Sequence, residues 1–169
     1  YLKTGISLLC DGHWEAHYDL SLELYTFYAE AEYCLGHFQE VGYAAGIVLK
    51  EAESFENKLR VYSTLIRSLA AQNKIQDAFE IGFNILSKLG VNCQYQPPDK
   101  SIITKDLMNM TKALEDLSGT EFLNHKMMDN DKMIAAMKFL RLLNFYAFFS
   151  KQEHLFFIIN QMMNLTLTY

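Results

Sequence analysis

The sequence contains few of the residues that mark turns and nucleotide-binding loops. It has only 8 glycines and 2 prolines in 169 residues, too few for the many turns of a β-sandwich. It contains no Gly-x-x-x-x-Gly-Lys, Gly-x-Gly-x-x-Gly or Gly-x-Ser-x-Gly pattern. These absences exclude a P-loop, a kinase glycine loop and a hydrolase nucleophile elbow from this segment. We therefore expect no catalytic residues and no cofactor here.

Cysteine is scarce as well. Cys10, Cys34 and Cys93 are an odd number of thiols at unrelated spacings, which favours free thiols and a cytoplasmic setting. The sequence opens at Tyr1 without a secretory signal, and we interpret it as a fragment of a longer protein. The charge-free run 155–169 is shorter and more polar than the roughly 20 apolar residues of a membrane span. We therefore predict no membrane span.

Metal-ligand types occur close together once, at Cys10, His13 and His17. Their spacings of three and four residues would suit one side of a helix, and thiolates and imidazoles are zinc ligands. However, Gly12 interrupts the helical pattern, and no fourth ligand follows nearby. The sequence therefore predicts no metal site.

Basic residues are also scarce in the first third of the chain. The net charge is -5, and residues 11–56 contain 10 acidic side chains against Lys50 alone. This balance argues against nucleic acid as a partner, because phosphates attract basic surfaces. An acidic face is most often simply solvated, and the alternative is that it attracts a basic partner.

The abundant residues are helix formers with apolar positions three and four residues apart. They predict an all-α protein built as a single domain over 1–169. The predicted elements are hairpins at about 14–52 and 56–90, a linker at 91–102, and further helices at 104–117, 130–150 and 152–168. Gly90 fits a helix C-cap, Thr104 fits an N-cap, and Asp129 or Asn130 fits the N-cap of the long helix.

A repeat relates the two predicted hairpins. A shift of 37 residues places Gly36 on Asn73, Phe38 on Ile75 and Val41 on Ala78. Each unit has a helix, a tight break and a second helix, as in tetratricopeptide repeats, whose period is 34. We expect a left-handed or strained turn at Gly36 and a buried Ala78. Because one hairpin cannot bury its own apolar face, we predict a right-handed stack of antiparallel hairpins, a tetratricopeptide-like α-solenoid.

Several short strings resemble one known family, the degenerate tetratricopeptide region of very large signalling kinases. The strings are Tyr33-Cys34-Leu35-Gly36-His37-Phe38-Gln39-Glu40, Ala71-Gln72-Asn73-Lys74-Ile75-Gln76-Asp77-Ala78, Leu89-Gly90-Val91 before Pro97-Pro98, Met127-Met128-Asp129 leading into Ala135–Leu140, and Leu8-Leu9 before Trp14-Glu15 and Tyr18. The resemblance implies a kinase-like and an AAA-type ATPase segment before this region, with GAF and histidine-kinase domains commonly following it. The helical region itself is not known for catalysis.

Together these features predict a non-catalytic module for protein–protein or interdomain interaction within a multidomain signal-transduction kinase. The candidate acidic contacts are Glu23, Glu30, Glu32 and Glu40. The alternative is a solenoid sensor that binds a small-molecule inducer and regulates an adjacent ATPase.

The sequence also suggests where three groups of large side chains lie. Trp14 is interpreted as an anchor between helices, with an interaction hot spot as the alternative. The eight methionines, all after residue 100, are expected mainly in the core. The last hairpin has more aromatic surface than it can hide by itself, so we expect it to pack on preceding helices or on a neighbouring domain. The aromatic residues are Phe145, Phe148, Phe149, Phe156 and Phe157.

Overall fold

A computed structural model describes residues 1–91, 99–115, 127–150 and 152–169. Within these ranges the chain forms nine helices, and every regular element is α-helical, which confirms the predicted all-α class. The chain divides into two compact units, Tyr1–Ala78 and Phe79–Tyr169. The division falls inside a helix, α6 (Ile75–Lys88).

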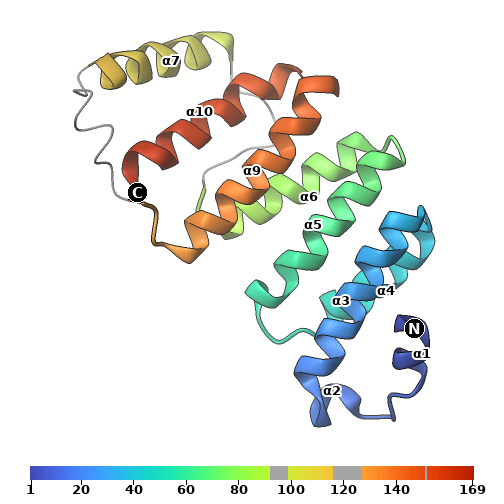
Figure 1. Cartoon of the computed structure of the whole chain (residues 1–169). Helices are drawn as coiled ribbons and strands as arrows, with labels where there is room; N and C mark the ends of the chain where they lie inside the picture. The colour runs from blue at the N-terminus through green and yellow to red at the C-terminus, as the bar shows by residue number, and fades with distance from the viewer. Residues whose placement is uncertain (92–98, 116–126, 151) are drawn as a thin grey trace. The chain divides into compact units, whose positions relative to one another are not determined.

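The first unit contains the helices α1 (Leu2–Ser7), α2 (His13–Ala16), α3 (Tyr18–Leu35), α4 (Phe38–Glu51) and α5 (Phe55–Ala71), followed by the start of α6. It is built around α3, α4 and α5, which run antiparallel from one to the next and pack side by side, while α1 and α2 pack against α3 (Figure 1). Its core is rich in alanine and valine, including Ala29, Ala44, Ala45, Val48 and Val61, so the helix axes can approach closely.

The predicted turn at Gly36 is confirmed. Gly36 has φ 77°, in the left-handed region, and ends α3 directly before α4. Asn73, its predicted equivalent, also has a positive φ of 61°. In both turns the following amide donates to the carbonyl oxygen five residues earlier: His37 N to Glu32 O and Lys74 N to Leu69 O, each at 2.9 Å. This six-residue closure is a helix-ending motif.

Gly90 closes α6 in the same way, as predicted. Its φ is 90°, and the Val91 amide donates to the Leu86 carbonyl oxygen at 2.9 Å. The predicted burial of Ala78 is also confirmed, and its equivalent Val41 is buried too.

Two predicted helix starts are corrected. The first hairpin was expected from about residue 14, but α2 stops at Ala16, and the non-helical His17 separates it from α3. The helix expected at Thr104 begins earlier, at Lys100, inside the predicted linker. Asp99 directly precedes it, and aspartate is a favoured N-cap residue. The predicted helix end at Leu117 lies outside the described residues.

The second unit contains the rest of α6 with α7 (Lys100–Glu115), α9 (Asp131–Ser150) and α10 (Gln152–Thr168). Within it, α10 packs against both α7 and α9 (Figure 1). The long helix α9 is capped by Asn130, one of the two predicted candidates, whose Oδ1 accepts from the amides of Lys132 and Met133.

The core of this unit joins α6 to the last two helices. The ring of His154 in α10 is buried and lies 5.3 Å from the ring of Phe79 and 5.5 Å from that of Phe83. Gly82 of α6 packs directly under Leu143 of α9, because a Cβ atom added at Gly82 would lie 2.6 Å from Leu143 Cδ2.

By length and composition, α9 is the one helix in the described ranges that would suffice to cross a membrane. A buried core helix of a soluble protein meets the same criteria. Six of its residues are buried against the rest of the chain: Met133, Ala136, Phe139, Leu140, Leu143 and Ala147.

The methionines are less uniformly buried than predicted. Met133 belongs to the core, whereas Met108 and Met127 are exposed, so the expectation of core positions is wrong for these two. Met128, Met137, Met162 and Met163 are partly buried. Met127 directly follows residues outside the described ranges, and Met108 belongs to α7.

Replacing Gly36 by alanine should lower the free energy of unfolding by about 1 kcal/mol, because a side chain in the left-handed region is strained. The same change at Gly46 should raise it by about 0.5–1 kcal/mol. Gly46 lies inside α4, and an added Cβ would meet no atom within 4 Å. Urea unfolding of both variants measures the sign of each change in the free energy of unfolding. Equal changes in the two variants would contradict a left-handed turn at Gly36.

Gly82→Ala should destabilise the second unit by about 1–2 kcal/mol, because the new methyl group displaces the buried Leu143. In a Leu143→Ala background the clash is removed, so the same change should become neutral or stabilising. A double-mutant cycle measured by urea unfolding checks this. An equal cost in both backgrounds would show that α6 and α9 do not meet at this point.

Candidate interaction surface

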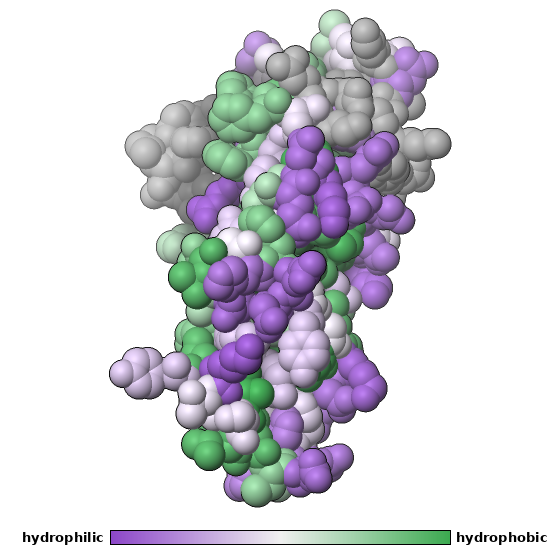
Figure 2. Space-filling view, turned by 90° about the vertical axis from the view of Figure 1, so that its right-hand side faces the viewer, coloured by the Kyte–Doolittle hydropathy of each residue, from purple (hydrophilic) through white to green (hydrophobic). Residues whose placement is uncertain are grey.

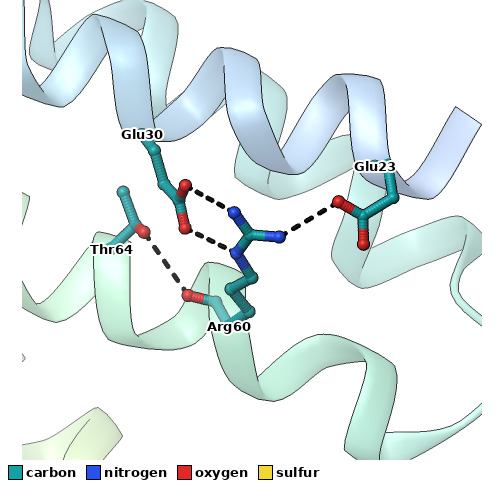
Figure 3. Close-up of polar contacts among 4 residues, drawn as sticks. All are labelled: Glu23, Glu30, Arg60 and Thr64. Atoms are coloured by element: carbon teal, nitrogen blue, oxygen red, sulfur yellow. Dashed lines mark hydrogen bonds and ion pairs between the residues drawn. The ribbon is translucent and has the colours of Figure 1, made fainter.

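Two of the four predicted acidic contacts are brought together by Arg60. The guanidinium of Arg60, on α5, donates from Nε and Nη2 to the two carboxylate oxygens of Glu30 at 2.7 and 2.8 Å. It also donates from Nη1 to Glu23 Oε2 at 3.1 Å (Figure 3). Both glutamates belong to α3, so this bidentate pair joins two helices that are not consecutive.

Phe27 completes this contact. The guanidinium carbon of Arg60 lies 4.3 Å from the centroid of the Phe27 ring, within the range of a cation–π interaction. The hydrogen bond to Glu30 raises the pKa of Arg60, although partial burial works in the opposite direction. Since the Arg60 side chain is 42% exposed, water screens these charges and the contribution to stability is modest.

The other two acidic candidates lie at the turn between α3 and α4. The buried Tyr28 hydroxyl donates to Glu40 Oε2 at 2.7 Å. Glu32 Oε2 lies 2.6 Å from His37 Nδ1. Burial raises the pKa of Tyr28 above its ordinary value, and the hydrogen bond to Glu40 and the charges of Glu32 and Glu40 raise it further.

All four predicted acidic contacts therefore interact with groups of their own unit. The other exposed acidic side chains in this stretch include Asp11, Asp19, Glu53 and Glu56. On the face drawn in Figure 2, hydrophilic side chains cover much of the surface, with apolar side chains in separate patches between them. The internal partners of the four glutamates match a solvated acidic surface better than a single large acidic site.

Trp14 packs inside the first unit, as the anchor interpretation predicts. Its ring stacks on that of Tyr25 at 5.8 Å and meets Tyr18 edge-on at 5.9 Å. The hydroxyl of Tyr18 accepts hydrogen bonds from the Glu53 amide and from Asn57 Nδ2. The aromatic group thus connects α2 and α3 to the start of α5.

His13 also takes part in this packing. Its Nδ1 lies 2.8 Å from Ser21 Oγ, and its ring stacks on Tyr25. Across the described residues, no three His, Cys, Asp or Glu side chains are grouped so as to hold a metal ion. Cys10 and Cys34 are free and exposed, whereas Cys93 lies outside the described ranges.

The second unit exposes most of the predicted aromatic residues. Phe145, Phe148 and Phe149 of α9 are 59%, 60% and 71% exposed, and Phe156 of α10 is exposed as well. Only Phe157 is partly covered, with its ring 6.4 Å from that of Phe83. Among the described residues, preceding helices therefore do not cover the other four rings.

Two basic residues on the same side of α9 were missed by the sequence analysis. Lys138 and Arg141 are exposed and precede Phe145 by seven and four residues, spacings that place all three on one side of a helix. A helical projection of residues 131–150 would have revealed them.

Comparisons with known proteins give no match. No protein-family model, curated protein or solved structure is similar to this chain. The resemblance to large signalling kinases therefore stays a prediction.

The raised pKa of Tyr28 predicts that the folded protein loses stability in alkaline solution. Because the pKa of this hydroxyl is raised in the folded protein, its full contribution to the free energy of unfolding is present below pH 10, the ordinary pKa of tyrosine. The contribution decreases as the pH rises further. Tyr28→Phe should cost about 1 kcal/mol at neutral pH, through the lost hydrogen bond to Glu40. The same substitution should also make the free energy of unfolding fall less steeply above pH 10.

Tyr33→Phe is the matched control, because Tyr33 also lies on α3 and its hydroxyl makes no hydrogen bond with a described residue. Urea unfolding of the three proteins at several pH values provides the measurement. An alkaline decline in Tyr28→Phe as steep as in the parent chain would contradict the assigned role of this hydroxyl.

Proposed function

We propose that this chain is a non-catalytic helical-repeat module that mediates protein–protein or interdomain contacts within a cytoplasmic, multidomain signal-transduction kinase. In this proposal the helices form a right-handed, tetratricopeptide-like stack of antiparallel hairpins. The observation that carries it is the repetition, 37 residues apart, of a long helix, a left-handed turn and a 14-residue helix.

The equivalence extends to the backbone. The second helices, α4 and α6, each have 14 residues and begin 37 residues apart, at Phe38 and Ile75. The left-handed turns at Gly36 and Asn73 and their closing hydrogen bonds have the same spacing. Repeated conformation at a fixed period supports a repeat architecture, although this period is longer than the 34 residues of a tetratricopeptide unit.

Packing within the first unit supports stacking. Helix α3 contacts α5 as well as its hairpin partner α4, and Arg60 links α5 to two glutamates of α3. In stacked hairpins each unit buries the apolar face of its neighbour, and the exposed faces form an extended binding surface.

The engaged acidic residues favour an apolar contact surface over an acidic one. Glu23, Glu30, Glu32 and Glu40 already have internal partners, so a partner that used them would have to displace these contacts. Large apolar side chains are exposed in both units, among them Leu20 on α3 and Phe148 on α9. Exposed apolar groups of this kind mark interaction surfaces when they are clustered.

Site-specific photo-crosslinking in the cells that produce the parent protein tests the proposal. Benzoylphenylalanine would replace Leu20, Phe148 or, as a control of similar exposure on α4, Tyr43. We expect crosslinks from position 20 or 148 to a defined polypeptide segment, and none from position 43. No crosslink from positions 20 and 148, together with a small metabolite that raises the Tm, would favour the ligand-sensor alternative instead.

A further inference from the structure

The outer side of α9 carries a continuous row of basic and aromatic side chains. We call this row, Lys138, Arg141, Phe145, Phe148 and Phe149, the α9 stripe. Successive spacings of three, four, three and one residues place it along one side of the helix. The opposite side is occupied by the buried core residues, so the stripe faces away from the core of the unit.

The aromatic end of the stripe is preorganised. The ring of Phe149 lies edge-on to those of Phe145 at 5.3 Å and Phe148 at 5.1 Å. All three side chains are more than half exposed. A cluster of exposed aromatic rings in mutual contact is the kind of surface that forms the centre of an interface.

The basic end has no acidic partner within the described residues. Lys138 and Arg141 are exposed and form no ion pair there. Arg60, by contrast, is held by two glutamates and a phenylalanine. The two charges of the stripe therefore remain available to acidic groups from outside.

We propose that the α9 stripe binds an amphipathic helix of another protein, with acidic residues facing Lys138 and Arg141 and an apolar face on the three phenylalanines. This proposal rests on the proposed function as an interaction module. The stripe spans about three helical turns, or roughly 16 Å. Its ridges suit a second helix with apolar residues at positions i, i+3, i+4 and i+7.

Charge favours an acidic protein helix over a lipid surface. Binding to anionic membranes through basic residues typically uses a cluster of four to eight of them. The stripe contributes two, and the whole chain has a net charge of -5. A short acidic helix needs only the complementary pair.

Selection from a phage-displayed library of randomised helical peptides tests the proposal on the intact chain. We expect enriched peptides with apolar residues at helical spacing and Asp or Glu toward one end. The best peptide should bind the Phe145→Ser/Phe149→Ser variant at least about tenfold more weakly. Because these side chains are exposed, the Tm of the variant should stay unchanged.

A charge exchange separates specific docking from general stickiness. The chain with Lys138→Glu and Arg141→Glu should lose affinity for the acidic peptide and regain it for the peptide with its acidic residues changed to lysine. Lys132→Glu is the matched control, because Lys132 is exposed on α9 outside the stripe, and it should leave affinity unchanged.

Several outcomes would overturn the proposal. These are an absence of enriched peptides, peptides that bind the phenylalanine variant equally well, and peptides without acidic residues. Phenylalanine-dependent flotation with phosphatidylserine vesicles would identify a membrane as the occupant. A dimer in sedimentation equilibrium that the phenylalanine variant loses would identify a second copy. A crosslink from position 20 alone would support the proposed interaction function, but it would show that the α9 stripe is not the surface used.

Discussion

The abrupt reversal after each long helix is the constraint on which the rest of the first unit depends. At Gly36 a left-handed residue ends α3, and α4 begins two residues later. The next helix must therefore return antiparallel along the previous one. A pair of helices closed in this way still has apolar faces on its outside, and α5 covers part of them by packing on both α3 and α4.

Charge is used differently in the two units. In the first unit Arg60 and the Tyr18 hydroxyl make contacts between segments 30–39 residues apart, and two acidic side chains of α3 are thereby joined to α5. In the second unit aromatic contacts of Phe79 and Phe83 with His154 join α6 to α10, and the basic side chains of Lys138 and Arg141 are exposed.

Local features were predictable from the sequence, and long-range ones were not. Gly36, Gly90 and Asn130 could be located because glycine after a helix and asparagine before one have local physical causes. The break at His17 has no glycine or proline to mark it. The partner of Glu23 lies 37 residues away, and helix periodicity gives no information about which charges meet across such a distance.

The orientation of α9 was hard to predict because apolar residues lie on most of its sides. Phe145 and Phe148 fit the apolar pattern of a helix, yet the smaller Ala136 and Ala147 are buried and the rings are exposed. Small residues allow close contact between helices, as Gly82 does beneath Leu143. Large rings on the opposite side contribute little to the packing of their own unit. The same rings lie beside Lys138 and Arg141, which form no ion pair within the described ranges, and this arrangement is the basis of the proposed contact with an acidic helix.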